Sequence, residues 1–174
     1  MSATDFKTLA QNALQFYQDG NFESAAGLFG EAASALQAQG NTLDAAEMQN
    51  NQSVALLQAG DAHGSYNSAH NTAQVFAEAG DFRREGMAYG NEASALAAMG
   101  KMDAAVQSYQ LAAAALEKTG EYQLRASVMQ ALAGIQLRQG KIMNAMLSMK
   151  IGMAAVKNPT FKQRILQLLL RFLK

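Results

Sequence analysis

The hydrophobic and polar residues of this chain fall into segments of about twenty positions, each closed by a glycine. Within a segment, Ala, Leu and Met are interspersed with Gln and Glu, which are all good helix formers. No stretch shows the sustained alternation of apolar and polar residues that is typical of a β-strand. The closing glycines follow one interval: Gly20, Gly40, Gly60, Gly80, Gly100, Gly120 and Gly140. Because glycine readily adopts the left-handed conformation that ends many helices, the pattern predicts helices of about 16–18 residues joined by tight turns.

The residue after four of these glycines also favours a turn or the start of a helix. These residues are Asn21, Asn41, Asp61 and Asp81. The side chains of Asn and Asp accept hydrogen bonds from the free backbone N–H groups of a first helical turn. We therefore expect a new helix to begin directly after each of these turns.

The repeating unit is two helices long, because alternate segments resemble each other. Small side chains recur at three fixed distances from every second glycine: Ala13, Ala25, Ala32, Ser53, Ser65, Thr72, Ala93, Ala105, Ala112, Ala133, Ala145 and Gly152. Small residues let paired helices approach closely, so we expect these positions at helix contacts. The repeats then cover residues 1–39, 40–79, 80–119 and 120–157. The second repeat matches least well, since Ala62 and Ala69 replace large residues of the others.

Two stretches carry a recognisable motif. They read G-N-F-x-x-A-x-x-x-F-x-x-A from Gly20 to Ala32 and G-K-M-x-x-A-x-x-x-Y-x-x-A from Gly100 to Ala112. In these motifs the chain resembles the tetratricopeptide (TPR) family over residues 5–157, in a long-helix variant of 40 residues rather than about 34. The resemblance implies an all-α, right-handed α-solenoid of four helix pairs with a concave groove. It also implies a non-catalytic scaffold or adaptor that binds a peptide or helix of a partner protein in that groove.

In the TPR family the first helix of each pair lines the groove, and the register with the glycines assigns the groove residues. The resemblance implies a partner groove of Tyr17, Asn50, Asn51, Val54, Leu57, Met87, Gly90, Asn91, Ser94, Gln130, Gly134, Leu137 and Arg138. Asn51 and Asn91 occupy the same place in successive repeats, where an amide in similar scaffolds binds the backbone of a peptide. The alternative is that each of them bonds its own neighbouring helix. Gly90 and Gly134 either leave room for a ligand or ease packing between repeats.

The end of the chain predicts a further helix over residues 158–174. Asn158 and Pro159 are typical of a helix start, and the sequence FKQRILQLLLRFLK after Thr160 is amphipathic and basic. We interpret this helix as a cap on the solenoid, with a dimer contact, a partner helix or an anionic membrane surface as alternatives. The C-terminal contact surface would contain Met149, Met153, Arg164, Leu168, Arg171 and Phe172. The second candidate function is therefore a subunit or assembly factor of a membrane-associated complex.

Methionines of the last repeat recur at helical spacing, which adds to that end of the chain. They are Met143, Met146, Met149 and Met153. A stripe of this kind suits either the core of a helical protein or an adaptable binding face, because the methionine side chain is flexible and polarizable. The pattern alone leaves both alternatives open.

The composition removes several classes of protein. The 174 residues contain no Cys, which excludes a disulfide scaffold, a Cys-ligated zinc site and a Cys nucleophile. The HExxH, Walker A and GxSxG motifs are absent, and His63 and His70, on one face of a predicted helix, have no patterned third ligand. We therefore expect no enzyme activity, metal or cofactor. With no leader segment and no apolar run of roughly 18 residues, we expect a cytoplasmic protein that contacts membranes only peripherally.

The charges balance over the chain but are separated along it. Residues 1–80 hold one basic and eight acidic residues, a net charge of −7, whereas residues 81–174 hold thirteen basic and six acidic residues, a net charge of +7. After Glu121 there are nine Lys or Arg and no acid. In a solenoid this order becomes a spatial order, so an acidic protein surface, an anionic bilayer or the N-terminal end of another copy should meet the C-terminal end. Nucleic acid is not expected, because aromatic residues for base stacking do not interleave with the basic ones.

Overall fold

The computed structural model describes residues 3–154, 156, 159–160, 164–165 and 168. Within these residues the fold is all α-helical and contains no strand. The helices are α1 (Ala3–Gln18), α2 (Phe22–Ala38), α3 (Thr42–Gln58), α4 (Ala62–Ala69), α5 (Thr72–Glu78), α6 (Phe82–Ala98), α7 (Met102–Glu117), α8 (Tyr122–Arg138) and α9 (Ile142–Ala154). The helix predicted over residues 158–174 falls largely outside the described residues.

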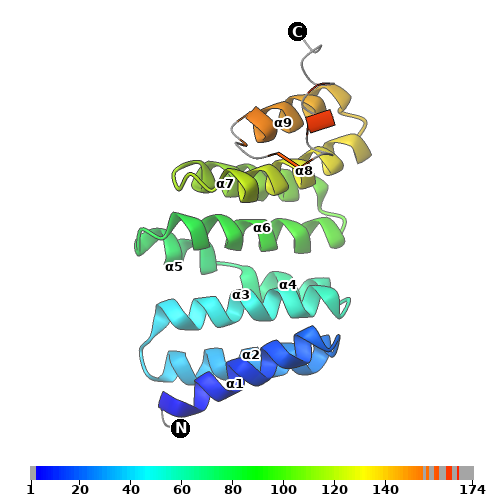
Figure 1. Ribbon diagram of the computed structural model, residues 1–174. Helices are drawn as coiled ribbons and strands as arrows, with labels where there is room; N and C mark the ends of the chain where they lie inside the picture. The colour runs from blue at the N-terminus through cyan, green and yellow to red at the C-terminus, as the bar shows by residue number, and fades with distance from the viewer. Residues whose placement is uncertain (1–2, 155, 157–158, 161–163, 166–167, 169–174) are drawn as a thin grey trace.

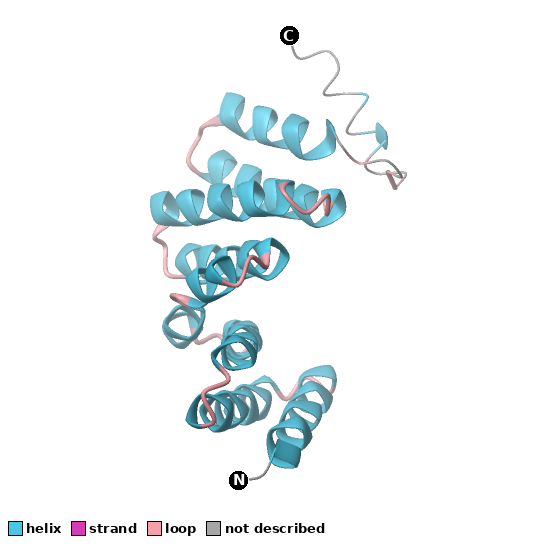
Figure 2. Cartoon of the chain, turned by 90° about the vertical axis from the view of Figure 1, so that its left-hand side faces the viewer, coloured by secondary structure: helices cyan, strands magenta, loops and turns pink. Residues whose placement is uncertain are grey.

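The helices form a single series from the N-terminal end at the bottom of Figure 1 to the C-terminal end at the top. Each helix packs against the next one along the chain, and α6 contacts α3, α4 and α5 across the middle of the series. Turned by 90°, the same helices follow one another from bottom to top (Figure 2). The expected all-α fold with a serial, repeat-like packing of neighbouring helices is confirmed, whereas the right-handed sense of the solenoid stays a prediction.

The turns between the helices follow the glycine pattern. All seven closing glycines have a positive φ, from +71° at Gly80 to +89° at Gly60. This is the left-handed conformation that favours glycine. The side chains of Asn41, Asp61 and Asp81 accept the predicted hydrogen bonds from backbone N–H groups three residues later. Asn21 begins its helix without such a bond. Local sequence therefore determines where these helices end and begin.

The small residues lie where helices meet. All twelve of the recurring small positions are buried, and most have no measurable exposure. In the second repeat, where serines replace two of the alanines, the hydroxyls of Ser53 and Ser65 bond each other at 3.0 Å. The expectation that these positions form the helix contacts is confirmed. The two serines are tolerated there because each hydroxyl is the hydrogen-bond partner of the other.

The second helix of the second repeat is broken, which the sequence did not predict. Residues 62–78 form two short helices, α4 and α5, instead of one helix of about 16–18 residues. Asn71 lies at the break with φ +69°, and the hydroxyl of Thr72 donates to the carbonyl oxygen of Ala69 at 2.7 Å. The expectation that His63 and His70 share one helix face is also wrong, because α4 ends before His70. His70 instead stacks on Tyr66 and lies 3.2 Å from a carboxylate oxygen of Glu92.

The left-handed residue at this break gives a testable prediction. Replacing Asn71 with glycine should raise the free energy of unfolding by up to about 1 kcal/mol, because glycine adopts positive φ without steric strain. Asn71→Val should lower it by about 1–2 kcal/mol, since a branched side chain is disfavoured there. Both variants are compared by urea unfolding followed by circular dichroism. Equal stabilities of the two variants would contradict a left-handed residue 71.

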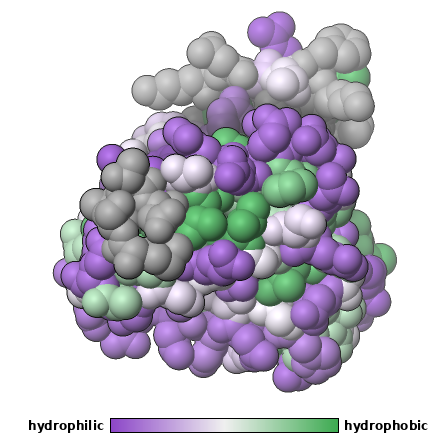
Figure 3. Space-filling view, turned by 90° about the horizontal axis from the view of Figure 1, so that it is seen from below, coloured by the Kyte–Doolittle hydropathy of each residue, from purple (hydrophilic) through white to green (hydrophobic). Residues whose placement is uncertain are grey.

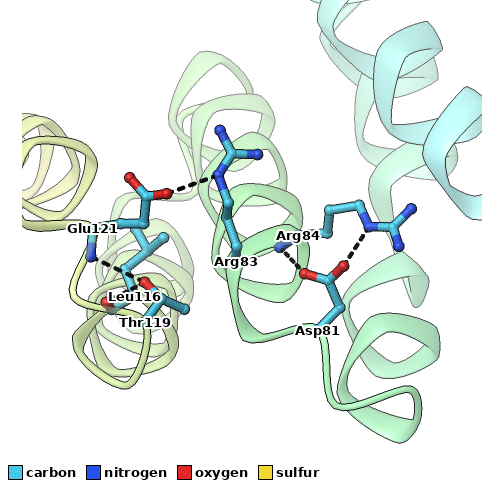
Figure 4. Close-up of polar contacts among 6 residues, drawn as sticks. All are labelled: Asp81, Arg83, Arg84, Leu116, Thr119 and Glu121. Atoms are coloured by element: carbon cyan, nitrogen blue, oxygen red, sulfur yellow. Dashed lines mark hydrogen bonds and ion pairs between the residues drawn. The ribbon is translucent and has the colours of Figure 1, made fainter.

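Ion pairs tie successive repeats together near the turns. They join Glu47 to Arg84 (2.8 Å), Arg83 to Glu121 (3.2 Å) and Asp103 to Lys141 (3.5 Å). Arg84 also contacts Asp81 at 2.7 Å, and Figure 4 shows this contact beside the Arg83–Glu121 pair. The backbone hydrogen bond from Arg84 lowers the pKa of Asp81 against the opposing effect of burial. Partial burial by itself would lower the pKa of Arg84, but its bonds to Asp81 and Glu47 raise it.

Candidate functional site

A pocket of about 380 Å³ lies between the first helices of the first two repeats. Its lining comes from α1, α2 and α3: Ala10, Gln11, Leu14, Tyr17, Phe29, Met48, Asn51 and Val54. Three of the predicted groove residues, Tyr17, Asn51 and Val54, are thus brought together. The wall is mostly apolar with two side-chain amides, which is the usual composition of a site that anchors a partner's side chain.

Packing from α2 holds the shape of this pocket. The ring of Tyr17 meets the ring of Phe22 edge to face, with the ring centroids 5.3 Å apart. Phe29 is buried and Leu14 is exposed, so the pocket runs from the core to the surface of the N-terminal end. Seen from that end, apolar surface gathers near the centre within a ring of hydrophilic residues (Figure 3). Phe29 and Met48 were not among the predicted site residues, because the lining that they provide depends on how α2 and α3 pack.

The two repeated asparagines differ in their surroundings. The amide nitrogen of Asn91 donates to the side-chain oxygen of Asn50 at 2.8 Å, joining α6 to α3. Asn50 was predicted to line the groove but is only 6% exposed, because this contact buries it. For Asn91 the alternative of bonding a neighbouring helix is therefore correct. Asn51 is half-buried, and its side chain makes no hydrogen bond to the described residues.

The other predicted groove residues lie outside this pocket. Leu57, Met87, Gly90 and Ser94 are half-buried on α3 and α6, while Gln130, Leu137 and Arg138 are exposed on α8 and Gly134 is half-buried there. The Ser94 hydroxyl donates to the carbonyl oxygen of Gly90 and lies 2.9 Å from the hydroxyl of Tyr109.

The two groove glycines are not required by the packing between repeats. A Cβ atom built at Gly134 would meet nothing within 4 Å, and one at Gly90 would meet only a Val128 methyl group at 3.9 Å. The alternative that these glycines ease helix packing is therefore wrong for Gly134, and at Gly90 a methyl group would make only an ordinary van der Waals contact. Both leave open surface along the first helices of the third and fourth repeats.

Two more hollows occur at equivalent places in the repeats. One, of about 1250 Å³, lies between α2 and α3, and another, of about 370 Å³, is formed by α7, α8 and α9. Six lining positions of the first recur exactly two repeats later in the second: Gly30 and Gln110, Ala33 and Ala113, Ser34 and Ala114, Gln37 and Glu117, Gln49 and Met129, Gln52 and Leu132. These hollows therefore belong to the repeat architecture itself.

The predicted C-terminal contact surface is divided. Met153 is buried with Ala126 and Val156, and Met149 packs on the same cluster, so this half of the methionine stripe belongs to the core. Because α9 turns Met153 toward α8, Met153 does not belong to a C-terminal contact surface, and its prediction as part of that surface is wrong. Arg164 and Leu168 are exposed, whereas Arg171 and Phe172 lie outside the described residues.

In the described part of the chain, no group of three His, Asp or Glu side chains could hold a metal ion. None of the described helices combines the length and apolar character needed to cross a bilayer. In comparisons with known proteins, no family model and no curated protein matches the chain. A functional assignment therefore rests on the geometry of the pocket and of the helix surfaces.

Proposed function

We propose that this protein is a cytoplasmic, non-catalytic adaptor of the TPR type, which binds a short segment of a partner protein at the pocket between α1 and α3. The observation that carries this proposal is the convergence of Tyr17, Asn51 and Val54 on one apolar pocket of about 380 Å³. These are groove positions that the family resemblance implies, and they come from the first helices of two successive repeats.

The lining suggests the chemistry of the bound segment. An apolar side chain of the partner would enter between Leu14, Phe29 and Val54, where it would leave water and contact other apolar groups. The amide of Asn51 both donates and accepts, so it could bond a backbone N–H or C=O of the same segment. Because residues 1–80 carry a net charge of −7, basic residues beside the apolar anchor would strengthen the association.

Filling the pocket provides the test. Ala10→Phe should weaken binding of the partner at least about tenfold, because the new ring takes the place of the partner's anchor. Asn51→Ala should weaken it about five- to tenfold through the lost hydrogen bond. The partner is first recovered by affinity purification from the native cell, and its binding to the purified variants is then measured by titration calorimetry.

The matched control is Gln107→Phe on α7, an exposed position that lies away from the pocket and was not predicted to line the groove. It should bind the partner as the unsubstituted protein does, with the same helical content. Unchanged binding of both Ala10→Phe and Asn51→Ala would rule out the pocket as the binding site.

A further inference from the structure

The outward face of α9 differs from the same face of every other second helix. Three exposed positions on it, at +3, +7 and +11 from the turn glycine, hold Met143, Leu147 and Ile151, with exposed fractions of 68%, 57% and 38%. The same positions hold Glu23, Gly27 and Glu31 in the first repeat, His63, Asn67 and Asn71 in the second, and Asp103, Gln107 and Leu111 in the third. All of these are exposed as well. These three positions thus form a stripe that faces solvent in every repeat, and only in α9 are all three residues apolar.

A following helix of the series would not cover this stripe. The positions on α7 that match it are Asp103, Gln107 and Leu111, and they stay exposed although α8 packs on α7. A terminal helix placed on α9 as α8 is placed on α7 would likewise leave the outward stripe open. The stripe therefore requires another explanation than capping.

The charge around the stripe indicates what covers it. Lys141, which forms an exposed ion pair with Asp103 at 3.5 Å, precedes α9, and Lys150 lies one helical turn from Leu147. Glu117 lines the same hollow as Leu147 and Ile151 but is paired with Arg125 at 3.2 Å, so cations outnumber carboxylates beside the apolar side chains. Residues 122–174 contain nine Lys or Arg and no carboxylate side chain, so none of them repels a uniformly negative surface. Exposed Ile165 and Leu168, next to Arg164, continue the same combination beyond α9. Apolar side chains bordered by cations are what an anionic lipid surface binds.

We propose that the outer stripe of α9, formed by Met143, Leu147 and Ile151, is a contact surface for an anionic lipid bilayer. The three side chains enter the boundary between headgroups and acyl chains, while Lys150 and Lys141 lie at the level of the phosphates, where Lys141 would exchange its exposed pair with Asp103 for a phosphate. This contact is independent of the pocket between α1 and α3, which lies at the other end of the series (Figure 1). It would hold the adaptor on a membrane with its acidic end free for a partner.

The experiment measures co-sedimentation of the full chain with vesicles of phosphatidylglycerol in an excess of phosphatidylcholine. We expect binding to these vesicles, weaker binding at high salt, and none to vesicles of phosphatidylcholine alone. The triple variant Met143→Gln, Leu147→Gln, Ile151→Gln should lower the partition coefficient about 100-fold, because three apolar side chains no longer leave water. Glutamine suits an exposed helix position, as Gln107 shows in α7, so the variant should keep its helical content.

The matched control is Phe16→Gln on α1, which removes an apolar side chain that is 39% exposed, close to the value of Ile151, at the acidic end. It should bind the vesicles as the unsubstituted protein does. The proposal is overturned if the unsubstituted protein does not bind anionic vesicles, or if the triple variant binds them equally well. It is also overturned if the triple variant only abolishes a concentration-dependent self-association without lipid, since the stripe would then bind a second copy.

Discussion

Replacing Phe76 with alanine is expected to lower the free energy of unfolding by about 3–5 kcal/mol. Phe76 is completely buried and is the largest fully buried side chain among the residues that the structure describes. Its buried neighbours are Ala46, Ala73 and Ala88, which are too small to close over a cavity. The guanidinium group of Arg84 also lies over the ring, 5.1 Å from its centroid. The loss is measured by urea unfolding followed by circular dichroism.

Phe82→Ala serves as the control for this prediction. Phe82 is also a phenylalanine near the second repeat, but it is exposed. The ammonium nitrogen of Lys118 lies over its ring, 4.3 Å from the ring centroid. Its loss should cost less than about 1 kcal/mol. If both variants lost the same stability, Phe76 would not be the anchor that fastens the short helix α5 to the rest of the fold.

A second large effect is expected from Gly86→Ala, which should destabilise the protein by about 1–3 kcal/mol. A Cβ atom at this buried position of α6 would lie 2.6 Å from Cγ of Leu116 and 3.1 Å from the carbonyl oxygen of Ala112. Leu116 is fully buried and cannot move aside freely, so α6 and α7 would be forced apart. This strain outweighs the gain of about 1 kcal/mol that alanine normally brings to a helix interior.

The matched control is Gly134→Ala, which should stabilise the protein instead of destabilising it. A Cβ atom there would meet nothing within 4 Å, so only the gain in helix propensity remains. Thermal unfolding should show a higher midpoint for Gly134→Ala and a lower one for Gly86→Ala. A stabilised Gly86→Ala variant would mean that α6 and α7 do not approach as closely as the structure shows. The double variant Gly86→Ala, Leu116→Ala should lose less stability than the sum of its single changes, because the smaller side chain makes room.

Much of the fold could be predicted from local sequence signals. Each turn glycine has the left-handed conformation that its place predicted, and every one of the twelve recurring small residues is buried. The break at Asn71 was missed because no proline or glycine marks it. Its signals are a residue that tolerates positive φ and a following threonine hydroxyl that competes for a backbone carbonyl, and both are weak without tertiary context.

The candidate site could be predicted only in part. The register placed Tyr17, Asn51 and Val54 on the same surface, but it could not distinguish Asn51 from Asn50, which the contact with Asn91 buries. Neighbouring helical positions differ by only about 100° in direction, so a small rotation of α3 decides which amide faces the pocket. The stripe on α9 could have been found by comparing the same outward position in all four repeats.

Apart from the break between α4 and α5, the sequence by itself determined the helices, their ends and the small residues at their contacts. Those features depend on backbone conformations and spacings within one or two turns of each residue, which each segment of about twenty residues carries on its own. Only the tertiary structure decided which glycines are crowded, as Gly86 is and Gly134 is not, and which polar groups find partners. These features depend on the distance and rotation between helices, which are fixed when side chains far apart in the sequence pack together.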